Sequence, residues 1–410
     1  MFGNAGRYFI PVASNTNIRA SSAEEFYQEF YTFGGKDART GAPTGTLTQL
    51  GALQTITTGV TPDSRTIADQ DLSPMFQDEY ILGMQMAVGN DWTLGVRGIM
   101  REVGDGMDDY CSAYALTNWA KDKGFTKFDA HSAAPCVLVN PGRDVTIFVD
   151  TQNDGKFTEQ TIDAKYFDLP VYTRNYHAME IFWEKAAERW AMQGSYTMSK
   201  SKGNVEGYVN STLNQEDPGL TQEFDYSSFQ DGTYGYLPND RRHVLKMFGY
   251  YELTDSFRVG ANMSIQSGRP RSCQGFVPPT VRDFRPAQTP TGPLGGAGSY
   301  TSAATFYCLN DQGIAELTPR GTLGRTPWTS RYDLSFAYTP QFMGNRLTLQ
   351  ADIFNILDTQ KVTEYNEVRD FSRGTSNSTV PGVNQLNLNY KLPTSFQAPR
   401  SVRFTVRYEF

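Results

Sequence analysis

The sequence has 410 residues and a formal net charge of −7, with hydrophobic residues at 39%, aromatic residues at 13% and 37 glycines. The acidic balance argues against a nucleic-acid-binding protein, and no apolar run approaches the roughly 18 residues of a membrane-spanning helix. An aromatic-rich, glycine-rich and mildly polar chain is typical of a transmembrane β-barrel, which has a polar lumen and an apolar outer band. A large secreted β-protein would share this composition.

The N-terminal residues MFGNAGRYFIPV lack the basic segment and apolar core of a secretory signal peptide. An exported protein needs such a signal. The sequence therefore predicts either a processed chain or a fragment of a longer protein, and the number of strands favours the fragment.

Alternation of apolar and polar residues with a period of two predicts β-strands along the chain. Two N-terminal segments lie near 6–12 and 19–33, and weaker alternation follows near 77–88, 172–184, 190–200 and 243–253. The clearest segments are 92–101, 257–266, 331–338, 347–353 and 402–410. Together they predict about 11 strands, each with one apolar and one polar face.

The connections between these strands alternate in length. Short connections are 13–18, 89–91, 185–188, 254–256 and 339–345, and long ones are 34–76, 103–171, 203–240, 268–327 and 360–398. Short periplasmic turns that alternate with long external loops are the topology of outer-membrane barrels. A soluble β-sandwich would instead show short turns throughout, so the pattern favours the barrel.

The predicted strand number is odd, whereas single-chain bacterial barrels have even numbers. Eleven is half of 22, the number found in plugged outer-membrane transporters. We therefore expect an all-β fold: a transmembrane antiparallel β-barrel meander that is a truncated part of a 22-stranded barrel, with long extracellular loops. An odd number of strands also predicts that the first strand runs in the same direction as the last, toward the periplasm.

Charged residues at the polar positions of the predicted strands are expected to line the lumen. They are Arg97, Arg101, Arg174, Glu180, Lys246, Glu252, Arg258, Asp352, Arg403 and Arg407. These side chains would contact either a substrate or a plug domain, or they would form a hydrated ladder of ion pairs. On the lipid face, an isolated Arg or Lys at the membrane midplane would cost about 2–4 kcal/mol, which supports the assignment to the lumen.

Four cysteines, Cys111, Cys136, Cys273 and Cys308, match no zinc-binding spacing. Three disulfide pairings are possible. Because the cysteines fall two by two into two long loops, the sequence favours Cys111–Cys136 and Cys273–Cys308. Disulfides imply an oxidising compartment.

The segment 150–157 resembles a short calcium-binding loop. Asp150, Gln152 and Asp154 place oxygen atoms at alternate positions, and Gly155 permits a sharp turn. The twelfth position is Ile162 rather than the bidentate Glu of a calcium loop. The segment is therefore either a weak calcium site or a polar turn, and no other metal site is predicted.

Sequence signatures of catalysis are absent: there is no G-x-S-x-G elbow and no H-E-x-x-H motif. His131 falls in a loop, while His177 and His243 fall on strands. A membrane hydrolase or protease would need a His with a Ser or Asp at one barrel rim, and His243 beside Asp240 is the nearest pairing. We therefore expect no enzyme, no catalytic residue and no cofactor.

Several segments resemble the TonB-dependent outer-membrane receptors. Pro238, Asp240, Arg241, Arg242 and His243 are similar to the P-x-D-R-R-H segment that opens a barrel strand in that family. The segments 194–200 and 352–358 are similar to two other strand motifs, and the terminal Phe410 also matches. The run from 6 to 19 resembles the Oar-like subgroup.

The resemblance implies a 22-stranded barrel in the bacterial outer membrane, an N-terminal plug and a TonB box. Residues 1–410 would then be the C-terminal half of the barrel, without the plug or the first half. The implied function is energy-coupled uptake of an unidentified substrate, for which the fragment alone would not suffice. A passive porin-like barrel is the alternative.

The resemblance also implies partners. Outer-membrane lipid would surround the apolar face, and the TonB complex would act only through the N-terminal region that this sequence lacks. The terminal apolar row would be the signal that the barrel-assembly machinery reads. That row consists of Val402, Phe404, Val406, Tyr408 and Phe410.

Overall fold

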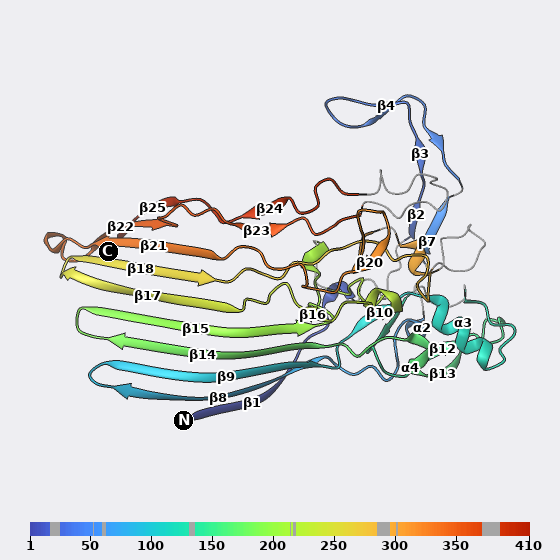
Figure 1. Ribbon diagram of the computed structural model, residues 1–410, viewed down its shortest axis with the longest axis horizontal. Helices are drawn as coiled ribbons and strands as arrows, with labels where there is room; N and C mark the ends of the chain where they lie inside the picture. Colours follow the sequence, from blue (N-terminus) through green and yellow to red (C-terminus); the bar gives the residue numbers. More distant parts are fainter. Residues whose placement is uncertain are drawn as a thin grey trace.

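The computed structural model describes residues 1–16, 25–51, 53–59, 63–130, 136–213, 215, 219–284, 296–300, 302–370 and 386–410. The strands of one large antiparallel sheet run along the long axis of the molecule, and the long connections gather beyond one end of the sheet (Figure 1). Among the described residues, no helix has the length and apolarity needed to cross a membrane.

The large sheet contains 11 strands, of which the two-residue β16 lies off the main path and pairs with β15. The order is β1-β8-β9-β14-β15-β17-β18-β21-β22-β25. Their bounds are β1 Phe2–Phe9, β8 Phe76–Val88, β9 Trp92–Gly104, β14 Arg174–Ala186, β15 Trp190–Gly203, β16 Gly235–Tyr236, β17 His243–Thr254, β18 Phe257–Gln266, β21 Thr329–Tyr338, β22 Leu347–Phe354 and β25 Ser401–Tyr408. In the described residues no ladder joins β1 to β25, so the sheet is open.

The order of the long strands is the order of the chain, as in a meander, and the turns alternate as the sequence predicts. Short turns join β8 to β9, β14 to β15, β17 to β18 and β21 to β22. Both chain ends lie toward the end of the sheet that carries these short turns (Figure 1). The opposite end carries the long connections.

The predicted strand at 19–33 does not join the large sheet. Residues 17–24 lie outside the described residues, and the rest of this segment forms small hairpins within a long connection. Those hairpins pair β2 (Glu25–Gln28) with β7 (Gln54–Thr58), β3 (Tyr31–Thr32) with β6 (Thr48–Gln49) and β4 (Gly35–Lys36) with β5 (Pro43–Thr44). The short turn predicted at 13–18 is therefore wrong, because β1 pairs directly with β8 across a connection that spans residues 10–75.

This pairing reverses the predicted direction of the first strand. Since ten long strands remain on the main path, β1 runs from the end with the short turns toward the long connections, antiparallel to β25. The parity argument from an odd number of strands is therefore wrong. The error has a local physical cause. The segment 25–33 has the residue pattern of a strand, but it pairs within its own connection and adds no strand to the large sheet.

The long connections carry most of the remaining elements. The strands are β10 Asp108–Tyr110, β11 Val137–Val139, β12 Val145–Val149, β13 Thr158–Ile162, β19 Tyr307–Leu309, β20 Ala315–Leu317, β23 Val362–Tyr365 and β24 Pro393–Phe396. The helices are α2 Ser64–Ile67, α3 Ala113–Asp122 and α4 Ala164–Phe167, with 3-10 turns at η2 Ser211–Leu213, η3 Ser227–Gln230, η4 Ala297–Ser299 and η5 Gln341–Met343. Apart from η5, which lies in a short turn, these helical elements belong to long connections.

We call the described residues of 63–75, 105–173, 204–234, 268–328 and 355–392 the loop cap. Its largest apolar core surrounds α3, where the Ser112 hydroxyl accepts a hydrogen bond from the Tyr114 amide (3.2 Å) and caps the helix N-terminus. Leu116 and Trp119 lie on one face of α3 and pack with Ile147 of β12 and Ile162 of β13. The main buried apolar clusters of the described chain therefore lie in the cap rather than in the sheet.

Candidate functional site: the polar face of the sheet and the loop cap

The register of the ladders divides the large sheet into two faces, because residues opposite each other in neighbouring strands project to the same side. Leu349, Val406 and their neighbours form the apolar face: Leu349 lies opposite Val406, and Ala351 lies opposite Phe404. Arg97 lies opposite Glu180 on the other side, which we call the polar face. The same register continues through every long strand.

All ten charged residues predicted to line the lumen lie on the polar face by this register. The strict period of two in the strands explains the agreement, since one register step moves a side chain to the opposite face. The alternation in the sequence therefore identified the two faces correctly.

Neighbouring strands carry opposite charges on the polar face. Arg97 Nη2 lies 2.9 Å from Glu180 Oε2, and Arg403 Nη2 lies 2.8 Å from Asp352 Oδ2. Arg101 Nε lies 2.5 Å from Glu79 Oε2. The arginines are one- to two-thirds exposed while their acidic partners are largely buried. This arrangement is the ladder of ion pairs that the sequence suggested, with cationic groups left accessible to water.

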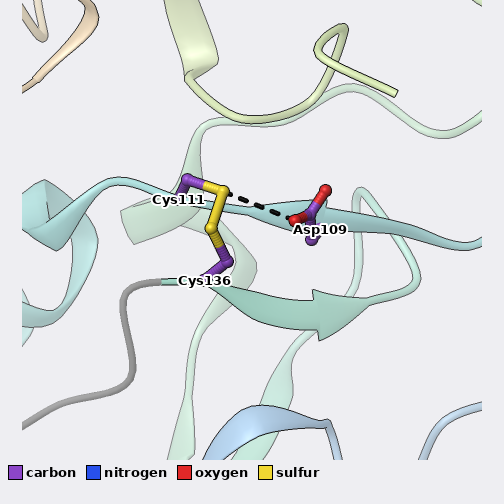
Figure 2. Close-up of side chains that lie close together, drawn as sticks. All are labelled: Asp109, Cys111 and Cys136. Atoms are coloured by element: carbon purple, nitrogen blue, oxygen red, sulfur yellow. Dashed lines mark hydrogen bonds between the residues drawn. A yellow bond between two sulfur atoms is a disulfide. The ribbon is translucent and has the colours of Figure 1, made fainter. Parts of the chain in front are cut away.

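The structure pairs Cys111 with Cys136 and Cys273 with Cys308, the same pairs that the sequence favoured. The first disulfide joins the ends of β10 and β11, and the second joins two segments of the connection between β18 and β21. Figure 2 shows Asp109 beside the first disulfide, with its Oδ2 atom 3.5 Å from Cys111 Sγ. These three residues have the clustering of a metal site, but the bonded sulfur atoms are not thiolate ligands.

Buried charged residues connect the separate segments of the cap, and the sequence analysis missed them. The Arg320 side chain is 1% exposed and forms an ion pair with Glu223, while its Nε donates to the Thr233 carbonyl at 2.7 Å. Burial raises the pKa of Glu223, and the attraction of Arg320 opposes that rise. Arg320 therefore links the connection that follows β18 to the connection that follows β15.

Two other buried carboxylates have a similar role. Asp108 accepts hydrogen bonds from the Thr221 amide (3.0 Å) and hydroxyl (2.8 Å), and burial followed by repulsion from Asp109 raises its pKa. Glu367 accepts from Arg269 Nη2 and from the Ser272 amide, each at 3.0 Å. Each carboxylate joins two connections that are far apart in the sequence. No local pattern marks such a residue, which explains why sequence reasoning missed it.

The P-x-D-R-R-H segment sits where the strands meet the cap. The buried Asp240 accepts a hydrogen bond from the Ser201 amide at 2.6 Å, forms an ion pair with Arg325, and lies 3.9 Å from Arg242 Nη2. His243 Nδ1 and the Tyr196 hydroxyl are hydrogen-bonded at 2.7 Å. The segment thus ties β17 to β15 and to the chain before β21, which is a structural role.

The two histidines in the described residues, His177 and His243, do not form the arrangement that a hydrolase would need. His243 stacks on Trp328, with ring centroids 5.7 Å apart, and bonds to Tyr196 rather than to Asp240. His177 is exposed on the apolar face. The predicted loop residue His131 lies outside the described residues.

The candidate calcium loop is the turn between β12 and β13. Asp150 accepts hydrogen bonds from the amides of Gln152 (3.2 Å), Asp154 (3.2 Å) and Gly155 (2.7 Å). Burial raises the pKa of Asp150, but these amide donors outweigh it and the net shift is downward. The Asp154 side chain accepts a hydrogen bond from the Lys156 amide at 3.0 Å, so both carboxylates shape this polar turn. The weak calcium site stays a prediction.

The terminal apolar row lies on the apolar face of β25, with Phe404 81% and Val406 70% exposed. Val402, Tyr408 and Phe410 are exposed as well. In the described residues β25 pairs with β22 alone. The row is therefore open to lipid and to a partner strand.

One curated protein and several solved outer-membrane structures resemble this chain. No model of a protein family matches the chain. The TonB-dependent transporter Oar of Myxococcus xanthus is 25% identical over 381 residues, which cover 86% of this chain and 29% of the relative. The chain thus spans about a third of the length of this curated relative.

Several solved structures match the chain at low sequence identity. The outer-membrane transporter YddB of Escherichia coli matches with 13% identity and a TM-score of 0.42, covering 83% of this chain and 33% of YddB. The ferripyoverdine receptor of Pseudomonas aeruginosa matches with 10% identity and a TM-score of 0.37, covering 89% of this chain and 35% of that receptor. At such low TM-scores the sequence relationship, and not superposition, carries the assignment.

A large antiparallel meander with one apolar face, short turns at one end and long loops at the other is an outer-membrane β-barrel architecture. Together with the sequence relationship, it makes this chain similar to the barrel of an Oar-like TonB-dependent receptor of the bacterial outer membrane.

Proposed function

We propose that this chain is the barrel segment of an outer-membrane receptor that takes up an unidentified substrate by energy-coupled transport. The observation that carries the proposal is the polar face, whose accessible arginines are held by partly buried acids. A cross-linked cap stands at one end of that face. Such a surface suits a hydrated path beneath a selective binding region, and the relative is a transporter.

We propose further that residues 1–410 are the C-terminal half of the barrel, and that a plug and the first half precede them in the intact receptor. Energy coupling through the TonB complex would then require that N-terminal region. The isolated chain would not transport.

The test is uptake by cells that express the intact receptor. Depletion of compounds from the growth medium would be followed by mass spectrometry in the parent strain, in a strain without the receptor and in a strain without TonB. We expect at least one compound to remain in the medium in both deletion strains. Depletion that survives the loss of TonB would contradict energy coupling and favour a passive porin.

A variant links this test to the polar face. Arg97→Gln with Glu180→Gln removes one ion pair and should slow depletion of that compound while the receptor stays in the membrane. Arg189→Gln is the matched control, because Arg189 pairs with Asp255 (2.9 Å) in the turns at the opposite end of the sheet. Equal uptake by both variants would argue against a role for the polar face.

We also propose that the terminal row is an assembly signal, recognised by β-strand addition to the barrel-assembly machinery. Deleting Phe410 from the intact receptor removes the burial of one side chain, which contributes about 1.5–3 kcal/mol to stability. This loss is too small to unfold a large barrel. We nevertheless expect a marked fall in membrane insertion and periplasmic accumulation. Thr405→Val on the polar face is the control, and unchanged insertion after the Phe410 deletion would leave the row with only a lipid-covering role.

A further inference from the structure

A groove of about 940 Å³ crosses the apolar face over β1, β8, β9, β14 and β15, which lie side by side in Figure 1. Its sides include Leu82, Met100, Met179 and Met198, and Gly98 forms part of its floor. A Cβ atom at Gly98 would find no heavy atom nearer than the Leu82 carbonyl oxygen at 4.0 Å. The floor is therefore open where a side chain would otherwise fill it.

The end of the groove nearest the cap is cationic. His177, Lys200 and Arg242 line it, and His177 lies opposite Lys200 in the ladder between β14 and β15. Lys202 follows on the same face, 4.5 Å from the ring of Tyr236, and Arg242 lies 5.0 Å from the same ring. A hydrogen bond with Arg242 is the main cause that lowers the pKa of Tyr236; burial opposes it, and the charges of Lys202 and Lys200 add to the lowering.

The nearby carboxylates leave the charge of Lys200 uncompensated. None of the residues that line the groove is acidic. Asp240 is buried and is shared by Arg325 and by Arg242, whose Nη2 atom lies 3.9 Å from it, and Asp78 is paired with Arg7 at 2.7 Å. Glu102 lies opposite Asn175, beyond the lining of the groove. Lys200 is exposed, and among the described residues no ion pair involves it.

The cationic end of the groove lies at the position along the strands where the lipid headgroups are expected. Trp190, near the short turns, packs against Trp92 with ring centroids 6.2 Å apart, as aromatic side chains do at a membrane interface. A tilted strand crosses the hydrocarbon in about 9–11 residues. Counting along β15 from Trp190, Lys200 therefore reaches the headgroups of the outer leaflet.

We propose that this groove binds an anionic lipid of the outer leaflet, with the lipid phosphate at His177, Lys200 and Arg242 and an acyl chain along Gly98. Charge complementarity selects the occupant. An apolar trough in a lipid-facing surface accepts an acyl chain, and the two cations Lys200 and Arg242 at headgroup height, with the His177 imidazole beside them, favour a phosphate that no choline neutralises. This binding is independent of the transported substrate, so its failure would leave the proposed transport untouched.

The test uses the intact receptor, purified in a non-ionic detergent and stripped of lipid. Native mass spectrometry would compare phosphatidylglycerol with phosphatidylcholine of the same acyl chains. We expect phosphatidylglycerol to remain bound at activation energies that release phosphatidylcholine. Lys200→Gln should weaken phosphatidylglycerol binding by about tenfold, the loss of one charge-assisted contact, and Lys156→Gln in the turn between β12 and β13 should not.

A second variant tests the acyl site separately. Gly98→Leu fills the floor of the groove and should abolish retention of phosphatidylglycerol while the receptor keeps its heat-modifiable mobility in gels. Inorganic phosphate should not displace the lipid, because it lacks the chain. Equal binding of the two lipids, full binding by Lys200→Gln or by Gly98→Leu, or displacement by phosphate would each overturn the proposal.

Discussion

The sheet and the loop cap place the same kinds of side chain in opposite situations. On the apolar face of the sheet, Phe404 is 81% and Leu82 68% exposed, whereas in the cap Trp119 is 1% and Phe224 0% exposed. The cap therefore folds by burying apolar surface from water, like a small soluble domain. The sheet has no such core of its own, and its apolar face is matched to lipid.

The two regions also use polar groups differently. Charged residues on the polar face of the sheet pair while they remain partly in water, so each pair contributes little to stability. In the cap, Arg320, Glu223 and Asp108 are buried, and losing one partner leaves a buried charge without compensation. Substitutions should therefore be costly in the cap and mild on the polar face.

The largest expected effect is on the core of the cap. Trp119→Ala should cost about 3–5 kcal/mol of cap stability, because it removes a fully buried aromatic side chain. Hydrogen exchange of the amides in α3 and β12 would measure it in the intact receptor. Trp328→Ala is the matched control, since Trp328 is 54% exposed; it should cost about 1 kcal/mol, the value of a stacked ring contact. Similar losses from both variants would contradict the separate core.

A smaller effect is expected from the first disulfide. Replacing both Cys111 and Cys136 with Ser should cost about 2–4 kcal/mol, the usual effect of removing a disulfide. Amide exchange should accelerate in β10 and β11 and stay unchanged in β14 and β15. Faster exchange in the long strands as well would show that the sheet depends on the cap.

The third prediction concerns Asp370, whose pKa burial raises to about 6 from its usual 3.8. Because the folded state holds this proton more tightly than the unfolded state, the stabilising contribution is complete below about 3.8 and disappears as pH rises through 6. The free energy of unfolding of the cap should therefore fall by about 2 kcal/mol between pH 4 and pH 7. Thermal unfolding followed at each pH would measure this loss. Asp370→Asn should flatten this dependence.

Asp311→Asn serves as the control for that titration, because the Asp311 side chain is fully exposed and pairs with Arg369 at 2.9 Å. It should leave the pH dependence as it is in the unsubstituted receptor. A flat profile in the unsubstituted receptor would contradict the raised pKa of Asp370.

The smallest effect is expected on the polar face. Arg97→Gln should change the free energy of unfolding by only about 0.2–1 kcal/mol, since the Arg97 side chain is 38% exposed. Denaturant unfolding in detergent at low and high salt would measure it, with the difference shrinking at high salt. A loss as large as that of Trp119→Ala would mean that the polar face, like the cap, is a stabilising core.

The sequence predicted the positions of most long strands and the face of all ten charged residues that it assigned to the lumen. It misplaced the segment 19–33, because hairpins within a loop have the same residue pattern as strands of the sheet. It treated 103–171 only as a long loop, although α3, β12 and β13 build an apolar core there. Phe224 and Phe229 fall in the predicted loop 203–240, yet both are buried in the cap.

By itself, the sequence determined the alternation of the strands and, with it, the two faces. It also indicated the cysteine pairs and the resemblance to a family. Alternation is a local property, and each face meets one uniform environment, so neighbouring residues are enough to reveal it. The tertiary structure alone decided that β1 pairs with β8, that Arg320 meets Glu223, and that His177, Lys200 and Arg242 gather at one groove. Those contacts join residues far apart in the chain, and their formation depends on how the strands and loops pack, which no local pattern encodes.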